Sequence, residues 1–144
     1  MGCFMTVKEY LSCVKLRQEE ITETEEYIER LRTTLGIAGI DYERDKIQTS
    51  VNGDKLGDTF VKIFEAEENL KRMKENFVVF RIGVMNMIQQ VPERKHREIL
   101  NHVYLDYMKL KQVAERMGYS YDYVRELHLE ALGCISEIFP HKFD

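Results

Sequence analysis

Apolar residues recur every seventh position along the first part of the chain. The positions are Val7, Val14, Ile21, Ile28 and Leu35. This spacing is typical of a helix that buries one seam against another helix, so we expect a helix from about Thr6 to Leu35. Thr6 and Glu9 have the spacing of a capping box, in which each side chain binds the other residue's backbone amide, and they mark the expected helix start.

A second stretch with the same seven-residue spacing starts at about Asp54 and ends at Val91. Its seam positions are Leu56, Ile63, Leu70, Phe77, Val84 and Val91, and the stripe is widened by Phe60, Ala66, Met73, Phe80, Met87 and Ile88. Gly36 and Gly39 predict the end of the first helix, and residues 36–53 are expected to form a loop. We expect the two helices to form an antiparallel, coiled-coil-like hairpin, with a seam closed within one chain or between two copies.

Pro92 fits the first turn of a new helix and disfavours continuation of the preceding one. We therefore place a domain boundary near Val91, with a helical hairpin for assembly or protein interaction in residues 1–91 and a second domain in residues 92–144. A supporting helix is expected from Glu93 to about Leu105. Its apolar face would consist of Ile99, Leu100, Val103 and Tyr104. The tail from Pro140 onward is expected to fray.

Residues 110–128 have the pattern of a helix-turn-helix. Two helices can cross closely over a short turn when three conditions are met. The first helix has a small residue at the crossing, the corner residue accepts positive φ, and the second helix contributes a branched apolar residue to the shared core. Ala114, Gly118 and Val124 meet these conditions in order. Ser120 is placed to cap the second helix. The wedge between the helices would be filled by Val113, Met117, Tyr119 and Leu127, with Lys111, Gln112, Glu115, Arg116 and Arg125 pointing outward. An ordinary helical hairpin with a glycine C-cap is the alternative.

Composition supports an all-α fold and limits the mode of DNA binding. The chain has no Trp, only two Pro, 44% hydrophobic and 32% charged residues, and a net charge of −4. Residues 92–144 contain eight Lys and Arg against nine Asp and Glu, a net charge of −1. Such a domain gains little sequence-independent attraction from phosphates, which favours a DNA reader tethered by a partner over a free-standing one.

Several other classes of protein are disfavoured. No apolar run approaches ~20 residues, so we expect no membrane span. The three cysteines have neither metal-like nor redox-like spacing and suggest a reducing, cytoplasmic compartment. The four histidines are spread along the chain, and we find no phosphate-binding glycine loop or nucleophile motif. We therefore expect no metal, no cofactor and no enzymatic activity.

The first two turns of the second helix would face base edges if that helix entered the major groove. We expect Arg125 to contact guanine, Asp122 or Glu126 to accept from cytosine, and Tyr121 to reach a phosphate or a thymine methyl. The flanking DNA backbone would be contacted by Lys109, Lys111, Arg116 and Ser120. For each residue the alternative is a solvated helix face, and for Arg125 an intrahelical ion pair. His128 fits a packed, hydrogen-bonded position as well as it fits a DNA contact.

Part of this stretch resembles region four of bacterial sigma factors. The matching positions are Arg97–Leu100, Tyr104–Asp106, Leu110, Val113–Gly118, Ser120, Val124 and Ala131–Leu132. The chain from about residue 7 to residue 138 resembles phage-encoded transcriptional regulators of the RinA and ArpU type, including a related phage family of unassigned function. The further positions that carry this resemblance are Asp54–Lys55, Gly57, Gly118–Tyr121 and Leu127–His128.

The resemblance implies a regulator that binds promoter DNA and recruits or modulates host RNA polymerase. Two departures concern the helix-turn-helix: sigma-like chains usually have Arg and Glu where Val103 and Gln112 stand, and Thr or Ser where Lys109 stands. Two alternatives are a phage DNA-packaging initiation subunit and a protein-interaction module that no longer binds DNA. The promoter sequence and the sign of regulation do not follow from these residues.

Overall fold

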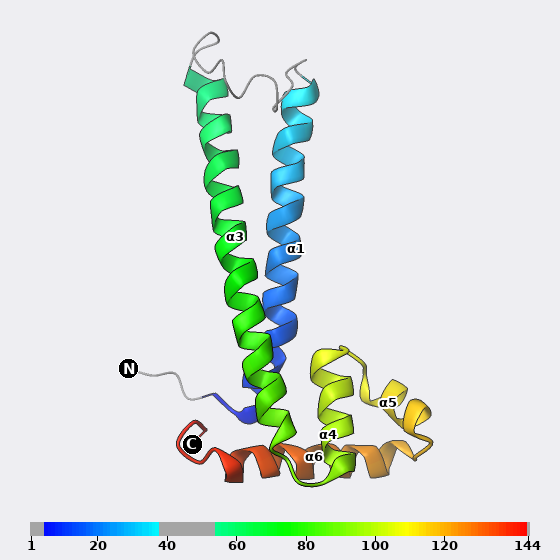
Figure 1. The fold of residues 1–144 in the computed structure, drawn as a ribbon. Helices are drawn as coiled ribbons and strands as arrows, with labels where there is room; N and C mark the ends of the chain where they lie inside the picture. The colour runs from blue at the N-terminus through cyan, green and yellow to red at the C-terminus, as the bar shows by residue number, and fades with distance from the viewer. Residues whose placement is uncertain (1–4, 38–53, 144) are drawn as a thin grey trace. The chain divides into compact units, whose positions relative to one another are not determined.

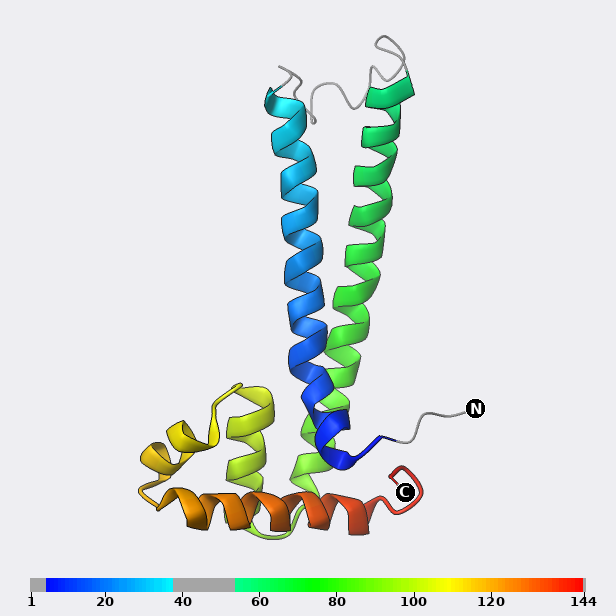
Figure 2. The same cartoon turned by 180° about the vertical axis from the view of Figure 1, so that it is seen from behind.

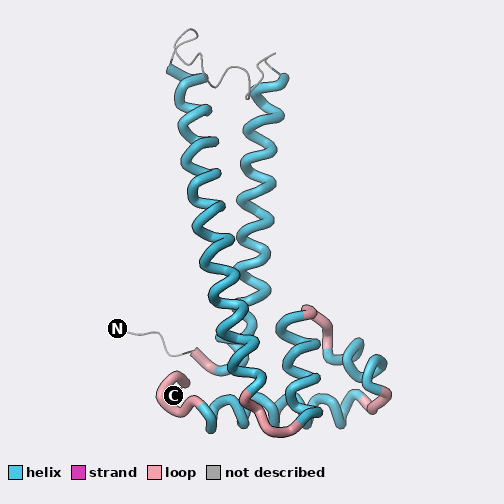
Figure 3. The backbone as a smooth tube through the Cα atoms, in the orientation of Figure 1, coloured by secondary structure: helices cyan, strands magenta, loops and turns pink. Residues whose placement is uncertain are grey.

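The computed structural model describes residues 5–37 and 54–143, and these residues form an all-α fold, as the sequence predicts. The helices are α1 (Val7–Ile37), α3 (Asp54–Gln89), α4 (Arg94–Leu100), the π-helical turn η1 (Asn101–Leu105), α5 (Leu110–Met117) and α6 (Tyr121–Ile138). Figure 3 shows helices and connecting loops, with no strand in the described ranges. None of the described helices combines the length and apolar character that a membrane crossing requires. The expected loop at 36–53 falls almost wholly outside the described residues.

The chain divides into two compact units, which we describe separately. Unit 1 contains residues 1–17 and 77–144, and unit 2 contains residues 18–76. Both units include part of α1 and part of α3. The division between packed units therefore lies within these helices, and the domain boundary near Val91 stays a prediction.

In unit 2, the described parts of α1 and α3 pack along the apolar seam. Ile28, Leu35 and Ile63 are buried together, and Leu56 and Leu70 pack half-buried against them. Polar contacts flank this seam: Nζ of Lys74 lies 3.4 Å from a carboxylate oxygen of Glu25, and Arg32 pairs with Glu67. The seven-residue spacing thus predicts the buried side of α1, since all five of its seam residues are buried.

In unit 1, the N-terminal end of α1 and the C-terminal end of α3 share one core with α6 (Figures 1 and 2). The buried residues include Leu11 and Val14 of α1, Val84 and Ile88 of α3, and Ile135 of α6, and Val91 itself is part of this core. If the chain were divided into two fragments at Val91, each fragment would therefore expose apolar residues that are buried in this core. Burial of these side chains contributes about 1.5–3 kcal/mol each.

The helix starts follow the sequence signals in one case and depart from them in another. The Thr6 amide donates to Oε2 of Glu9 at 3.2 Å, and the Glu9 amide donates to Oγ1 of Thr6 at 3.1 Å, which confirms the capping box. Pro92, by contrast, precedes α4 and lies outside its first turn, because Glu93 is the N-cap. The guanidinium of Arg97 donates to the carbonyl oxygens of Val91 and Pro92, each at 2.8 Å, and so holds this turn.

The supporting helix also departs from the expected regular helix over 93–105. After Leu100 the chain widens into a π-helical turn, in which the Asp106 amide donates to the Asn101 carbonyl oxygen at 3.0 Å, five residues earlier. Tyr107 then takes φ +58°, a left-handed conformation that is uncommon for a residue other than glycine. Ile99, Leu100 and Tyr104 are buried as expected, and Val103 is half-buried.

The tail does not fray as expected, because Phe143 is buried in the core of unit 1. The rings of Phe143 and Tyr10 pack edge-on with centroids 5.4 Å apart. Nζ of Lys142 lies 4.8 Å from the centroid of the Tyr10 ring. The tail thus returns to α1 after the end of α6.

Candidate nucleic-acid interface

The turn between α5 and α6 is built by Gly118 and Ser120. Gly118 ends α5 with φ +72°, and the Tyr119 amide donates to the Ala114 carbonyl oxygen at 3.0 Å, which closes the last turn. Oγ of Ser120 accepts from the Tyr123 amide at 3.2 Å and caps α6. Both expectations for the corner are confirmed: a glycine in the left-handed region and a serine cap together set the direction in which α6 leaves.

At its other end, α5 begins without a hydroxyl cap. The Lys109 side chain makes no capping bond, but the Lys109 amide donates to Oε1 of Gln112 at 2.8 Å. Of the two hydrogen bonds of a capping box, only the one from the N-cap amide to the side chain three residues later is therefore present here. This bond gives Gln112 a local role where the sigma-like pattern has Glu, while Val103 packs against the apolar core.

The crossing of α4, α5 and α6 is a small apolar core. Ala114 and Val124 are both buried there, together with Ile99, Val113 and Leu127. The expectations for the crossing residue and the returning branched residue are confirmed. Tyr119 corrects one expectation, because its side chain is exposed and does not fill the wedge between the helices.

The eight residues singled out for DNA contact all lie on the exposed side of this region. They are Lys109, Lys111, Arg116, Ser120, Tyr121, Asp122, Arg125 and Glu126. Val124 and Leu127 point inward from the same two turns of α6, so the outward face is set by the packing of the inward one. The structure brings Tyr121, Asp122, Arg125 and Glu126 together on the first two turns of α6.

Arg125 has no carboxylate partner among the described residues. Among the described residues of unit 1, Arg94 pairs with Glu98, while Glu130 and Asp106 are contacted by His96 and His102. The intrahelical pair weighed as an alternative for Arg125 is absent from the described contacts. Its guanidinium is therefore available for a bidentate contact with an external acceptor.

His128 is a packed residue and not a surface contact. Its Nε2 atom lies 2.7 Å from the hydroxyl of Tyr104, and its side chain is buried. Burial lowers the pKa of His128, and the positive charge of Lys8 lowers it further. Burial also raises the pKa of Tyr104. Both groups are thus held neutral, and their bond ties η1 to α6 behind the outward face.

A group that the sequence reading missed lies beside the first turn of α6. Nζ of Lys95, on α4, lies 3.5 Å from the hydroxyl of Tyr123, and the rings of Tyr119 and Tyr123 meet edge-on with centroids 5.1 Å apart. Tyr119 lies between the Gly118 C-cap and the Ser120 N-cap, outside both helices, so helical spacing does not relate its ring to that of Tyr123. The contribution of Lys95 does not follow from the sequence pattern either, because this residue comes from a different helix.

Other polar groupings give little support for catalysis. His96 contacts Glu130 at 3.1 Å through Nε2 and Cys134 at 3.8 Å through Nδ1. Burial and three nearby carboxylates raise the pKa of the Cys134 thiol, so it is a poor nucleophile at neutral pH. In the described ranges, no three His, Cys, Asp or Glu side chains are grouped to hold a metal ion.

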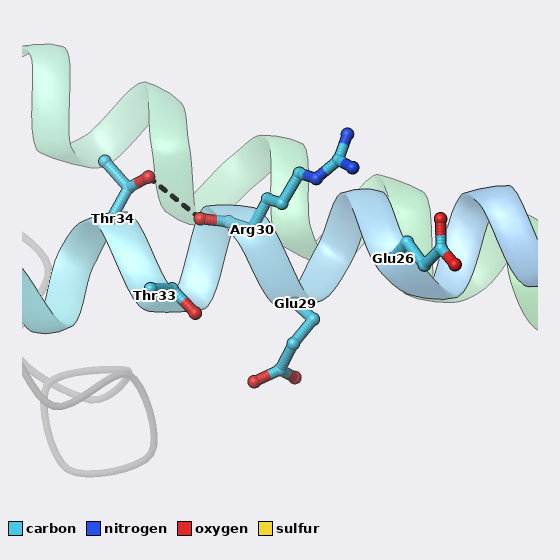
Figure 4. A pocket seen from close by; sticks show the side chains of 5 residues that line it. All are labelled: Glu26, Glu29, Arg30, Thr33 and Thr34. Carbon is cyan, nitrogen blue, oxygen red and sulfur yellow. Dashed lines mark hydrogen bonds between the residues drawn. The ribbon is translucent and has the colours of Figure 1, made fainter.

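Among the described residues, those that line a hollow in unit 2 all belong to α1. Figure 4 shows its side chains, which are Glu26, Glu29, Arg30, Thr33 and Thr34. Glu29 and Arg30 point to different sides of the helix, and Oγ1 of Thr34 donates to the Arg30 carbonyl oxygen at 2.8 Å. These groups do not converge on a common point, so we interpret them as the solvated charged surface that the glutamate-rich sequence suggests.

Comparison with known proteins places the chain in a family. A family described as "Protein of unknown function (DUF1492)" matches residues 37–131. No curated protein and no solved structure matches the chain. The matched range contains α3, α4, η1, α5 and the first half of α6, and so includes the corner and the outward face described above. Because this range is well over half of the 144 residues, the chain belongs to the DUF1492 family of proteins of unknown function.

Proposed function

We propose that the protein is a phage-type transcriptional regulator that binds promoter DNA through α6. The observation that carries this proposal is the outward face of the first two turns of α6, where Arg125 is exposed and has no carboxylate partner among the described residues. Helices that read the major groove present their N-terminal turns to base edges. Gly118 and Ser120 support the proposal because they fix the angle of α6 against the rest of unit 1.

In this proposal, Arg125 donates to O6 and N7 of a guanine, and Asp122 or Glu126 accepts from cytosine N4. Lys109, Lys111 and Arg116 supply positive charge along α5 for the flanking phosphates. The acidic residues on α6 lower the attraction to DNA in general. Affinity would therefore depend on base contacts and on a partner that holds the protein on DNA, for which host RNA polymerase is our proposal.

Selection of bound sequences from a pool of random duplexes tests this function. Full-length protein, with and without bacterial RNA polymerase, is incubated with the pool, and bound DNA is sequenced over successive rounds. We expect a short enriched motif that contains guanine at a fixed position. A pool that stays random under both conditions would rule out sequence-specific binding.

A protein-interaction module is the second candidate function, and one observation favours it. Leu129 lies one turn beyond Arg125 on the outward side of α6 and is 63% exposed. Exposed apolar side chains next to acidic ones suit a protein surface better than a phosphate backbone. This candidate would be favoured if the wild-type protein bound RNA polymerase in the absence of DNA and the Leu129→Asp variant did not.

We also propose that the protein self-associates through α3. In unit 1, the exposed apolar residues on this helix are Val78, Val79, Ile82 and Met85. Val78, Ile82 and Met85 follow the spacing of one helix face, which is the usual pattern of a helix–helix contact. Light scattering of the purified protein distinguishes a dimer, which we expect, from the many-subunit ring of a packaging-initiation protein.

A further inference from the structure

The ammonium group of Lys95 is held by two aromatic side chains and by no carboxylate in the described chain. It lies 3.5 Å from the hydroxyl of Tyr123, 5.4 Å from the ring centroid of Tyr119 and 5.8 Å from that of Tyr123. At these distances the ring faces attract the cation. The lysine is therefore positioned, while its positive charge is not cancelled.

The other cations near the start of α4 are already engaged. Nε of Arg94 lies 3.0 Å from a carboxylate oxygen of Glu98, and Arg97 donates to two backbone carbonyl oxygens. Lys95, unlike Arg94, has no carboxylate partner among the described residues, and unlike Arg97 it does not hold the turn at Val91 and Pro92. The hydrogen bond to the Tyr123 hydroxyl and the neighbouring Tyr119 raise the pKa of Lys95 above the ordinary lysine value. Among the Lys and Arg side chains of α4, Lys95 is therefore the one that places a charge without a described carboxylate partner beside the first turn of α6.

Tyr119 and Tyr123 present hydroxyl groups next to this charge, and both side chains are more than one-third exposed. A phosphodiester is an anion that accepts hydrogen bonds and donates none. One ammonium and two phenol hydroxyls are suitable donors for it. Tyr123 also lies between Asp122 and Val124 on the first turn of α6, so the cluster adjoins the outward face.

We propose that Lys95, Tyr119 and Tyr123 bind one phosphate of the DNA strand that α6 contacts. This inference rests on the proposed DNA binding and adds a backbone contact from α4, outside the two helices of the turn motif. The cluster carries no base information. Its contribution is electrostatic, and it is the same for every DNA sequence.

The test is fluorescence anisotropy of full-length protein with a labelled duplex across a salt series. Lys95→Gln is compared with Lys62→Gln, an exposed lysine of unit 2 that undergoes the same charge change. We expect Lys95→Gln to reduce the slope of log affinity against log salt by about 0.9 and to weaken binding roughly five- to tenfold near ~0.1 M salt. Lys62→Gln should change neither value appreciably.

Two further variants separate a phosphate contact from a structural role. Lys95→Arg keeps the charge and should restore the wild-type slope. The double substitution Tyr119→Phe and Tyr123→Phe keeps both rings and should weaken binding without changing the slope. A Lys95→Gln protein with a lowered Tm and an unchanged salt slope would overturn the phosphate proposal. Wild-type protein that binds no DNA would instead remove the proposed function itself.

Discussion

The hydroxyl of Tyr104 and Nε2 of His128 are 2.7 Å apart, and they join η1 to α6 inside the core of unit 1. The two rings also stack, with centroids 5.7 Å apart and an interplanar angle of 26°. Because both groups are buried, protonation of His128 would place a positive charge where water cannot solvate it. This pair therefore links the stability of the protein to pH.

We predict that His128 makes the protein less stable as the pH falls below about 6.5. The folded pKa of His128 is lowered, so the unfolded chain binds a proton at a higher pH than the folded chain does. The contribution of His128 to the free energy of unfolding is fully present above the unfolded pKa. It decreases as the pH falls from the unfolded pKa toward the lower folded pKa. Urea unfolding of wild type and His128→Gln from pH 7.5 to pH 5 measures it.

The difference between the two proteins is the informative quantity, because His96 and His102 contact carboxylates in both of them. We expect the stability advantage of wild type to shrink toward acid pH. Parallel pH curves for the two proteins would show that His128 does not resist protonation.

Tyr104→Phe should lower the free energy of unfolding by about 1–2 kcal/mol at neutral pH. The substitution keeps the ring and leaves Nε2 of His128 buried without its partner, which costs more than loss of an exposed hydrogen bond. Tyr27→Phe is the matched control, since the Tyr27 side chain is 47% exposed. Equal urea midpoints for the two variants would contradict a role for the Tyr104 hydroxyl in stability.

Gly118→Ala and Gly133→Ala should have opposite effects on stability. A Cβ at either position meets no atom within 4 Å, but Gly118 has φ +72° and Gly133 is inside α6. The left-handed conformation costs an alanine about 1–2 kcal/mol, whereas alanine in a helix stabilises by roughly 0.5–1 kcal/mol over glycine. Thermal unfolding measures both, and a neutral or stabilising Gly118→Ala would contradict the geometry of the corner.

Phe143→Ala should destabilise the protein by about 2 kcal/mol, although it is the penultimate residue. Its ring is buried in the core of unit 1 against Tyr10, so the substitution removes buried apolar surface. Leu129→Ala is the control on exposed surface and should change stability by less than about 0.5 kcal/mol. Equal Tm values for Phe143→Ala and wild type would show that the tail does not pack in solution.

The helices and the α5–α6 corner could be predicted from the sequence because their signals are local. The seven-residue spacing identifies the buried side of α1. The capping residues Thr6 and Ser120 identify the residues at which α1 and α6 begin. Gly118 and Val124 could be placed for the same reason, since each meets a geometric need of a short turn. The six exposed positions within α5 and α6 follow from the inward positions by helical periodicity, whereas Lys109 and Ser120 are N-cap residues outside the helices.

The remaining features depend on contacts between residues far apart in the chain. The burial of Phe143 requires Tyr10, and the positioning of Lys95 requires Tyr119 and Tyr123. The π-helical turn at 101–105 has no distinctive residue in the sequence. Its Tyr104 contacts His128 of α6, which lies 24 positions further along the chain. Tyr119 was misplaced because the residue after a left-handed glycine leaves the helix axis, so helical periodicity no longer gives its direction.

Arg125 provides the most direct measurement of DNA binding by α6. Anisotropy is recorded for wild type, Arg125→Gln and the control Arg30→Gln, an exposed arginine of α1, with a selected duplex and a scrambled one at low salt. We predict that wild type prefers the selected duplex, that Arg125→Gln weakens this complex tenfold or more and loses the preference, and that Arg30→Gln changes neither. Absence of binding by wild type at low salt, even with RNA polymerase present, would contradict the proposal that α6 reads DNA.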